Sequence, residues 1–204
     1  MNRIVFATAN QGKLKEIHQI LSDTGFEIVS MAEAGVDIDV EEDGTTFEEN
    51  ALIKARAVAA KLPGDIVMAD DSGLEIDYLG GEPGIYSARY LGHDTPYHEK
   101  NMHFIKLLEG VPDEKRTARF VCAIAAVLPD GREITTHGTY EGMIGYEEKG
   151  ANGFGYDPVF YLPDAKCYSA ELTDEEKHAR SHRGKALRAM RDELKKIYAN
   201  TDNK

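Results

Sequence analysis

Two changes of hydrophobic period near the N-terminus constrain this fold more than any other feature of the sequence. A short apolar run from Ile4 to Thr8 is typical of a strand, and Asn10-Gln11-Gly12 interrupts it. Apolar residues at helical spacing follow until Gly25, namely Leu14, Ile17, Ile20 and Leu21. A second apolar run at 28–31 completes a strand–helix–strand unit. This order predicts an α/β fold with a parallel or mixed sheet.

The rest of the chain continues to alternate between helical and strand patterns. Overlapping capping boxes, Thr45-x-x-Glu48 and Thr46-x-x-Glu49, predict a helix that reaches about Leu62. A buried strand at 66–69 is expected to end at Asp70-Asp71-Ser72-Gly73. The remaining elements are a helix from Pro96 with Met102, Ile105 and Leu108, paired strands at 120–128 and 133–139, and a helix near 181–198. The predicted sheet is therefore mixed and partly antiparallel.

Length, charge and cysteine content narrow the class of protein. The chain has 204 residues, which suits one domain or two small lobes around one core; we expect a single domain over 1–199 and a loose tail at 200–204. Its net charge of −12 disfavours binding to nucleic acid or to anionic membranes. No apolar run approaches the ~20 residues that span a bilayer, and no signal-peptide pattern is present. Cys122 and Cys167 lack metal-ligand spacing, so we expect a reduced, cytoplasmic protein.

The turn between the first strand and the first helix, Thr8-Ala9-Asn10-Gln11-Gly12-Lys13, is a candidate phosphate site. Backbone N–H groups at a helix N-terminus favour an anion, and Lys13 adds a full charge. The spacing is not that of a P-loop. The alternative is a polar turn with a solvated lysine.

Two acidic groups are candidates for water activation or metal binding. Asp70 and Asp71 follow a buried strand, and because adjacent strand residues point to opposite faces, one of them would face a given cleft. Glu41-Glu42-Asp43 precedes the predicted helix. Together the two groups could bind Mg²⁺, which takes one or two carboxylates plus waters and phosphate oxygens. The alternatives are an Asp-Ser-Gly turn and a solvated cluster at a helix start.

Two later segments could recognise a nucleoside. In Gly150-Ala151-Asn152-Gly153-Phe154-Gly155-Tyr156-Asp157-Pro158, glycines permit close backbone approach and two aromatic rings offer stacking surfaces for a base. Ser181 could cap the last helix, beside a basic cluster formed by Lys177, Arg180, His182, Arg183 and Lys185. The alternatives are a glycine-rich turn with core aromatics, and local charge pairs with Glu175 and Glu176.

In combination and order, these segments resemble one family. The sequence is similar to the noncanonical purine nucleoside triphosphate pyrophosphatases, the inosine/xanthosine triphosphatases also called Ham1-like proteins. The matching blocks are TANQGK (8–13), EEDGTTFEENALIKA (41–55), ADDSGLEID (69–77), LGGEPGIYSARY (79–90), GFGYDPVF (153–160) and ELTDEEKHARSHRG (171–184). The resemblance covers nearly the whole chain, and one departure is Ala9, where the family usually has glycine.

The resemblance implies a fold, a reaction and a set of site residues. The fold would be an elongated mixed sheet with flanking helices, in two lobes around a central substrate cleft, and the protein a homodimer. The reaction would be Mg²⁺-dependent hydrolysis of ITP, dITP and XTP to the monophosphate and pyrophosphate. Asp71 would be the general base and a metal ligand, with Glu41 or Glu42, preferably Glu42, as the other acidic ligand. The substrate would be bound by Thr8, Ala9, Asn10, Gln11, Gly12, Lys13, Lys54 and Ser72 at the triphosphate, by Phe154, Gly155, Tyr156 and Asp157 at the base, and by Lys177, His182 and Arg183 around base and sugar.

Simple chemistry supports a preference for 6-oxopurines over adenine. Hypoxanthine and xanthine present an oxo acceptor where adenine presents an amino donor, so a fixed donor, from His182, Arg183 or the backbone, would reject adenine. Excluding guanine needs a further element, which we place in the 153–157 loop. Two other functions remain open: a pyrophosphatase for modified pyrimidines or methylated bases, and a nucleotide sensor without turnover. A Nudix hydrolase is disfavoured because its motif is absent.

Overall fold

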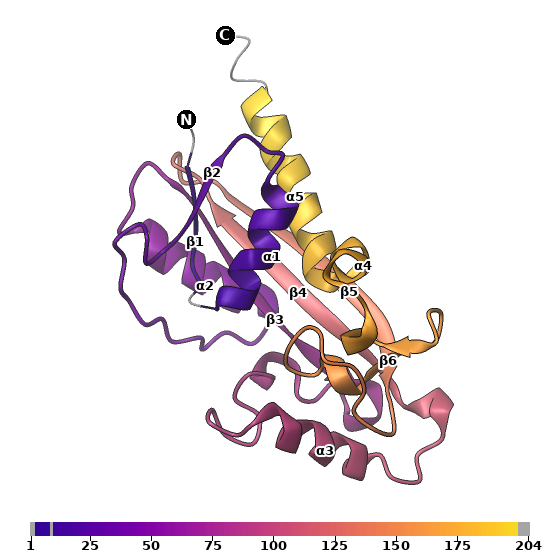
Figure 1. The fold of residues 1–204 in the computed structure, drawn as a ribbon. Helices are drawn as coiled ribbons and strands as arrows, with labels where there is room; N and C mark the ends of the chain where they lie inside the picture. Colours follow the sequence, from indigo (N-terminus) through magenta and orange to yellow (C-terminus); the bar gives the residue numbers. More distant parts are fainter. Residues whose placement is uncertain (1–2, 9, 200–204) are drawn as a thin grey trace. The chain divides into compact units, whose positions relative to one another are not determined.

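A computed structural model describes residues 3–8 and 10–199 of the chain, without the side chains of Gln11 and Ala199. The expectations for Ala9 and for the tail at 200–204 therefore lie outside the described residues. Helices and strands alternate as the sequence predicts, and the family-like α/β fold is confirmed (Figure 1). The helices are α1 (Gln11–Leu21), α2 (Phe47–Ala59), α3 (Tyr97–Leu107), α4 (Asp174–Arg180) and α5 (His182–Ala199). The strands are β1 (Arg3–Phe6), β2 (Glu27–Ser30), β3 (Ile66–Ile76), β4 (Thr117–Val127), β5 (Glu133–Ile144), β6 (Phe160–Leu162) and β7 (Cys167–Tyr168).

The seven strands form one mixed sheet in the order β2-β1-β3-β4-β5-β6-β7. Strand β1 pairs in parallel with β2 and with β3, as the predicted strand–helix–strand unit requires. Strand β6 pairs antiparallel with both β5 and β7. The short strands β6 and β7 and the helix α4 were not expected from the sequence, because elements of so few residues carry too little periodicity.

The chain divides into two compact units. The first unit comprises the described residues within 1–71, 122–138 and 183–199, and the second comprises Ser72–Val121 and Thr139–His182. Each unit has its own cluster of buried apolar side chains. The segments that resemble the family are thus distributed over both units.

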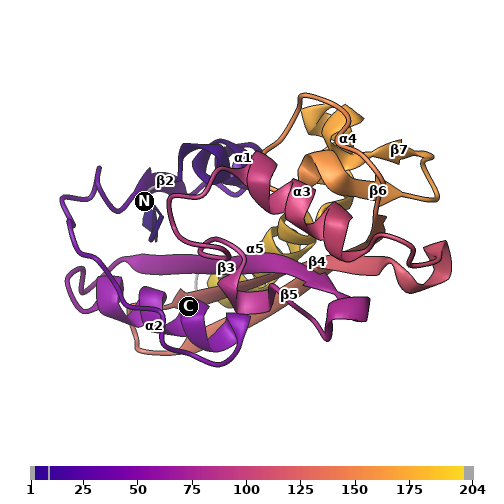
Figure 2. The same ribbon diagram turned by 90° about the horizontal axis from the view of Figure 1, so that it is seen from below.

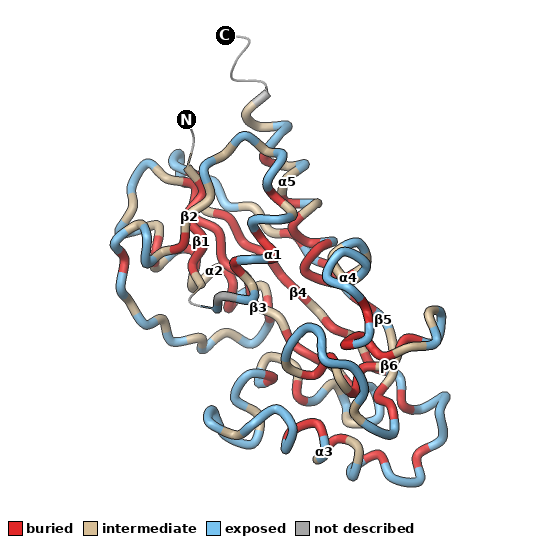
Figure 3. Tube along the Cα trace, in the orientation of Figure 1, coloured by how far each residue is buried: buried red, intermediate tan, exposed pale blue. Residues whose placement is uncertain are grey.

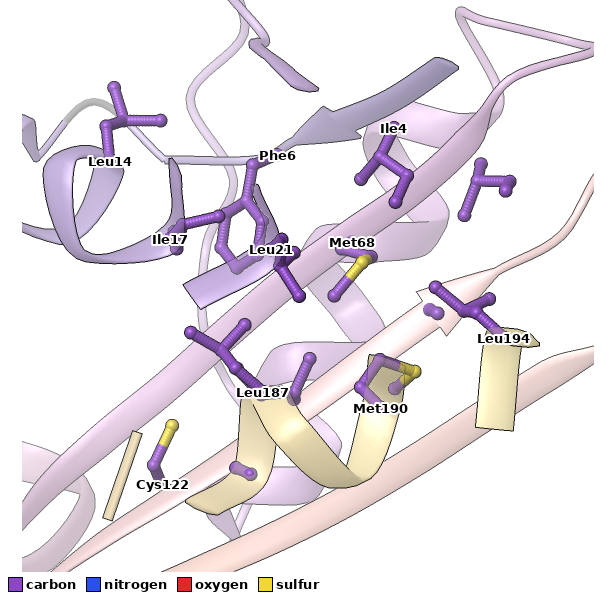
Figure 4. Close-up of a cluster of buried hydrophobic side chains, with 14 of the residues drawn as sticks. Ile4, Phe6, Leu14, Ile17, Leu21, Met68, Cys122, Leu187, Met190 and Leu194 are labelled. Carbon is purple, nitrogen blue, oxygen red and sulfur yellow. The ribbon is translucent and has the colours of Figure 1, made fainter. Parts of the chain in front are cut away.

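In the first unit, helices cover both faces of the strands (Figures 1 and 2). One face packs against α1 and α5, where Phe6, Ile17 and Leu187 are buried together (Figure 4). The opposite face packs against α2, whose Ala51, Ala55 and Val58 are fully buried. Strand β1 and the first-unit parts of β3 and β4 are consequently buried almost throughout, which explains their continuous apolar runs (Figure 3).

Two expectations about local structure were wrong. Strand β3 does not end at Asp70 but continues to Ile76, because the chain stays extended and Leu74 and Ile76 enter the core of the second unit. The helix after Pro96 does not bury Met102, which is 45% exposed; Asn101, Phe104 and Leu108 face inward instead. Ser181 follows the last turn of α4 and immediately precedes α5, which is the position that the predicted N-cap of the last helix requires.

Helix α2 begins as one of the two overlapping capping boxes predicts. The Thr46 hydroxyl accepts from the Glu49 backbone N–H at 3.1 Å, so Thr46 is the N-cap, but the Glu49 carboxylate accepts from the backbone N–H of Thr45, one residue before the cap. Glu48, the acidic residue of the other box, instead accepts from Thr135 on β5 at 2.7 Å.

Within the described residues, no helix is both long enough and apolar enough to cross a membrane.

Candidate functional site

The turn before α1 is organised by its own side chains. Asn10 caps the helix: its Oδ1 accepts from the backbone N–H of Lys13 at 3.1 Å. The Thr8 hydroxyl in turn accepts from the Asn10 backbone N–H at 3.2 Å. Gly12 is exposed. One of the first N–H groups of α1 is thus already used by the cap, and the side chain of Lys13 supplies the positive charge at this turn.

Asp70 lies in a buried network of opposite charges. Its Oδ2 is 2.8 Å from Nζ of Lys13 and 3.3 Å from Nε of Arg183, and Arg183 also contacts Glu16 at 2.7 Å. Burial alone would raise the pKa of Asp70, but these two cations, with Lys54, hold it well below its ordinary value. Asp70 is therefore an ionised, structural partner of the two cations.

Asp71 has the opposite electrostatic environment. Because it is adjacent in the strand, its side chain points to the other face, where Nδ2 of Asn50 donates to its Oδ2 at 3.0 Å. Burial raises the pKa of Asp71, and Lys54 and the Asn50 hydrogen bond only partly oppose this effect. A carboxylate whose ionised form is poorly compensated is suited to accept a proton or bind a cation.

Lys54 brings the two predicted acidic groups together. Its Nζ lies 3.2 Å from Oε1 of Glu42, and both Lys54 and Glu42 influence the pKa of Asp71. Glu41 is exposed, whereas Glu42 is partly buried. Among the described side chains, no group of three or more His, Cys, Asp or Glu forms a ready-made metal cage. A pair of carboxylates fits Mg²⁺, which usually completes its coordination with water and substrate phosphates.

In the second unit, Asp157 organises the glycine-rich loop. Its Oδ2 accepts from the Phe154 backbone N–H at 2.9 Å and from Nζ of Lys177 at 2.5 Å. Its Oδ1 accepts from the Ser169 hydroxyl at 2.7 Å. Gly153 has a positive φ of 76°, and a Cβ there would lie 2.4 Å from Oδ2 of Asp157. The loop closes around this buried carboxylate, and glycine is required beside it.

The two aromatic rings of this loop have different roles. Phe154 is 43% exposed, with Nζ of Lys177 5.1 Å from its ring centroid. Tyr156 is only 4% exposed; its hydroxyl donates to the Ser87 carbonyl at 2.7 Å and its ring packs against Tyr97. The expectation of two stacking surfaces was therefore wrong, since the core of the second unit covers the ring of Tyr156. Phe154 alone of the two can offer a face to a base.

Four members of the predicted basic cluster, Lys177, Arg180, His182 and Arg183, each contact different partners. Lys177 pairs with Asp157, and Arg180 lies 3.5 Å from Asp164, both in the second unit. His182 belongs to the same unit and stacks on Phe120, with centroids 5.0 Å apart and an interplanar angle of 17°. Arg183 belongs to the first unit, where two carboxylates engage its guanidinium.

Three polar residues of these sites were not predicted as site residues from the sequence. Asn50 is fully buried on α2, Glu16 is 5% exposed on α1, and Ser169 is 1% exposed before α4. Asn50 and Glu16 lie within the apolar stripes of their helices, where a polar residue must find a buried partner. A polar residue within an apolar stripe was therefore the sequence signal that could have identified Asn50 and Glu16. Ser72, also a predicted phosphate contact, is the first residue of the second unit and is partly buried.

Known proteins are similar to this chain in sequence and in fold over nearly its whole length. The Ham1 family model matches residues 4–193. The chain is 48% identical to the dITP/XTP pyrophosphatase of Desulforamulus reducens over 96% of this chain and 97% of the relative, and 48% identical to that of Clostridium perfringens over 97% and 99%. The solved Ham1 protein of Staphylococcus aureus superposes with a TM-score of 0.86 at 40% identity, covering 96% of this chain and all of that one. The chain therefore belongs to the Ham1 family.

Proposed function

We propose that this protein hydrolyses noncanonical purine nucleoside triphosphates, ITP, dITP and XTP, to the monophosphate and pyrophosphate. Curated relatives at 48% identity carry the name dITP/XTP pyrophosphatase. The observation that carries the proposal is the pair of adjacent aspartates with opposite environments. Lys13 and Arg183 pair with Asp70 and stabilise its ionised form, whereas Asp71 is buried and its pKa is raised. A nucleotide sensor would not need a carboxylate poised in this way.

The first unit supplies the groups for phosphate chemistry. Lys13 and Lys54 would neutralise the triphosphate, and the N-terminus of α1, with Thr8, Asn10 and Gly12, would bind its oxygens. The Asp71 carboxylate would take a proton from water as that water attacks phosphorus. The bridging P–O bond between the α- and β-phosphates then breaks, which gives the monophosphate and pyrophosphate whether water attacks the α- or the β-phosphorus.

We propose Mg²⁺ as the metal, bound by Asp71 and Glu42 together with substrate phosphate. When bound, it would neutralise charge on the phosphates. Glu42 is the better placed of the two predicted glutamates, because it lies against Lys54 whereas Glu41 is exposed. Lys54 would then hold Glu42 in position until substrate and metal arrive.

The second unit supplies the groups for base recognition. The exposed ring of Phe154 would stack on the purine, while Asp157 and Lys177 hold the loop in shape. His182 is our candidate for the donor to the 6-oxo group, because its stack on Phe120 fixes the plane of the ring. Arg183 would act indirectly, through its ion pairs with Glu16 and Asp70.

We also propose a cytoplasmic homodimer; sedimentation velocity at micromolar concentration would distinguish it from a monomer.

The decisive experiment measures pyrophosphate release with Mg²⁺ at mildly alkaline pH from ITP and XTP, compared with ATP, GTP, CTP and UTP. We expect strong release from ITP and XTP and little from the others, with loss of activity in EDTA and recovery on adding Mg²⁺. Release from pyrimidine nucleotides would retain the reaction but discard the proposed base recognition. Tight binding of ITP without pyrophosphate release would favour the sensor.

A further inference from the structure

Within the second unit, helix α3 packs against the loop Gly153–Asp157, which we call the nucleobase loop. One stripe of the helix contacts this loop. The ring of Tyr97 meets Tyr156 edge-on at 5.1 Å, and Phe104 meets the same ring at 5.7 Å. Asn101, one turn from Tyr97 on the same stripe, is 1% exposed. The helix thus presents one buried amide among aromatic contacts.

The Asn101 amide connects two segments of the loop region. Its Nδ2 donates to Oε1 of Glu148 at 2.7 Å and to the Gly155 carbonyl at 3.3 Å. The other oxygen of Glu148 contacts Nδ1 of His98, on the first turn of the same helix, at 2.5 Å. The carbonyl that Asn101 contacts lies directly after Phe154, so the amide acts on the backbone that carries the exposed ring.

These contacts allow only one orientation of the amide. If its oxygen and nitrogen were exchanged, the oxygen would face two acceptors, the Glu148 carboxylate and the Gly155 carbonyl. In the observed orientation Oδ1 is buried and, among the described residues, has no hydrogen-bond partner. An unsatisfied buried acceptor costs stability. A position selected for packing alone would be occupied more favourably by an apolar residue of similar size.

We propose that Asn101 is a positioning residue for nucleobase selection. By holding the Gly155 carbonyl and Glu148 together, it sets the angle at which Phe154 and the loop backbone meet the base. The inference rests on the proposed function, since it assigns Asn101 to the selectivity of that same reaction. Because the amide of Asn101 donates to Glu148 and Gly155, neither of which is a phosphate-binding candidate, its loss should affect binding and selectivity more than the chemical step.

The test compares Asn101→Leu with Thr117→Val, which removes a side-chain hydrogen bond to Asp77 elsewhere in the second unit. We expect Asn101→Leu to raise KM for ITP and to lower the ratio of kcat/KM for ITP to that for GTP by about tenfold, with kcat on ITP changed by less than about threefold. Thr117→Val should leave that ratio unchanged. An unchanged ratio in Asn101→Leu, or an equal loss on both nucleotides, would overturn the proposal.

A second readout does not depend on activity. The chain contains no tryptophan, so Phe154→Trp introduces a single fluorophore in the nucleobase loop. We expect lower fluorescence anisotropy and stronger acrylamide quenching when Asn101→Leu is added, and no change when Thr117→Val is added. If wild-type protein releases no pyrophosphate, the proposed function fails, but this measurement still tests whether Asn101 holds the loop.

Glu148→Ala keeps the test valid if Asn101→Leu does not fold. Glu148 is partly exposed, so its removal leaves the core intact while taking away one acceptor of the amide. We expect a smaller shift of the ITP/GTP ratio in the same direction, about threefold. If Asn101→Leu is insoluble and Glu148→Ala leaves both the ratio and the anisotropy unchanged, the proposal is wrong.

Discussion

In the first unit the residues around Asp70 are held by a buried network of ion pairs, whereas in the second unit the nucleobase loop is held by hydrogen bonds and ring contacts around the Asp157–Lys177 ion pair. Lys13, Arg183 and Glu16 form a buried network around Asp70. The nucleobase loop instead depends on the Asp157 carboxylate, a tyrosine hydroxyl and a helix amide. The two regions therefore respond differently to salt, pH and substitution.

This difference matches what each region would bind. A triphosphate carries several charges, which only opposing charges, helix N-termini or a metal can neutralise at low cost. Purine bases differ from one another in the position of neutral donors and acceptors, which a rigid loop distinguishes by geometry. Charge placement should therefore control the rate in the first unit, and loop geometry should control selectivity in the second.

The largest expected effect is at Asp71. Asp71→Asn should lower kcat on ITP by about a thousandfold, because the amide cannot accept the proton of the attacking water. Thermal melting should be unchanged or slightly higher, since burial disfavours the ionised carboxylate in the folded protein. Steady-state pyrophosphate release and a melting curve measure the two effects. If Asp70→Asn costs more activity than Asp71→Asn while both remain folded, the roles of the aspartates are reversed.

The largest expected effect on stability is at Asp70, the neighbour of Asp71. Asp70→Asn should reduce the free energy of unfolding by about 3 kcal/mol, because it leaves the cations Lys13 and Arg183 without their shared partner. Urea denaturation at pH 7 measures this loss, and Asp71→Asn is the matched control.

The pH dependence follows from the lowered pKa of Asp70. A carboxyl group with a lowered folded-state pKa contributes its full stabilisation above its unfolded value, near 4, and loses it as pH falls towards the folded value. The difference in stability between wild type and Asp70→Asn should therefore shrink steadily as the pH falls below about 4. A difference that stays constant across this range would contradict the assignment.

A smaller effect is expected in the second unit, at Asp157. Asp157→Asn weakens the contacts to Lys177 and to the Phe154 N–H, so the loop should lose its shape without losing the chemical step. We expect the preference for ITP over GTP to fall by about tenfold, measured as a ratio of kcat/KM. Asp164→Asn, at a more exposed carboxylate in the same unit, is the control. Unchanged nucleotide preference would refute a role for this loop in excluding guanine.

The smallest effect is expected from a single hydroxyl. Tyr156→Phe removes the hydrogen bond to the Ser87 carbonyl and should cost about 1 kcal/mol of unfolding free energy. Because the ring stays buried between Tyr97 and Phe104, nucleotide preference should change little. Tyr78→Phe, at a ring that is 52% exposed, is the control for losing a phenol. A large change in preference would mean that the Tyr156 hydroxyl itself contacts the base.

Local patterns predicted the elements well because their causes are local. The Thr46 cap lies three residues from its partner Glu49, and the apolar spacing of α1 lies within one helix. The alternation of a strand likewise indicated that Asp70 and Asp71 would face opposite sides. The end of β3 was missed because Asp-Ser-Gly favours a turn locally, whereas the core of the second unit continues the strand to Ile76.

By itself, the sequence determined the α/β architecture, the caps and the blocks that identify the Ham1 family. Only the tertiary structure decided which aspartate is ionised by cations, that Arg183 pairs with Glu16, and that Tyr156 is covered while Phe154 is exposed. The reason is physical: Asp70 and Arg183 are 113 residues apart in sequence, and a pKa depends on burial and on charges within a few ångströms. Such neighbours are set by the packing of helices on strands, which periodicity alone does not specify.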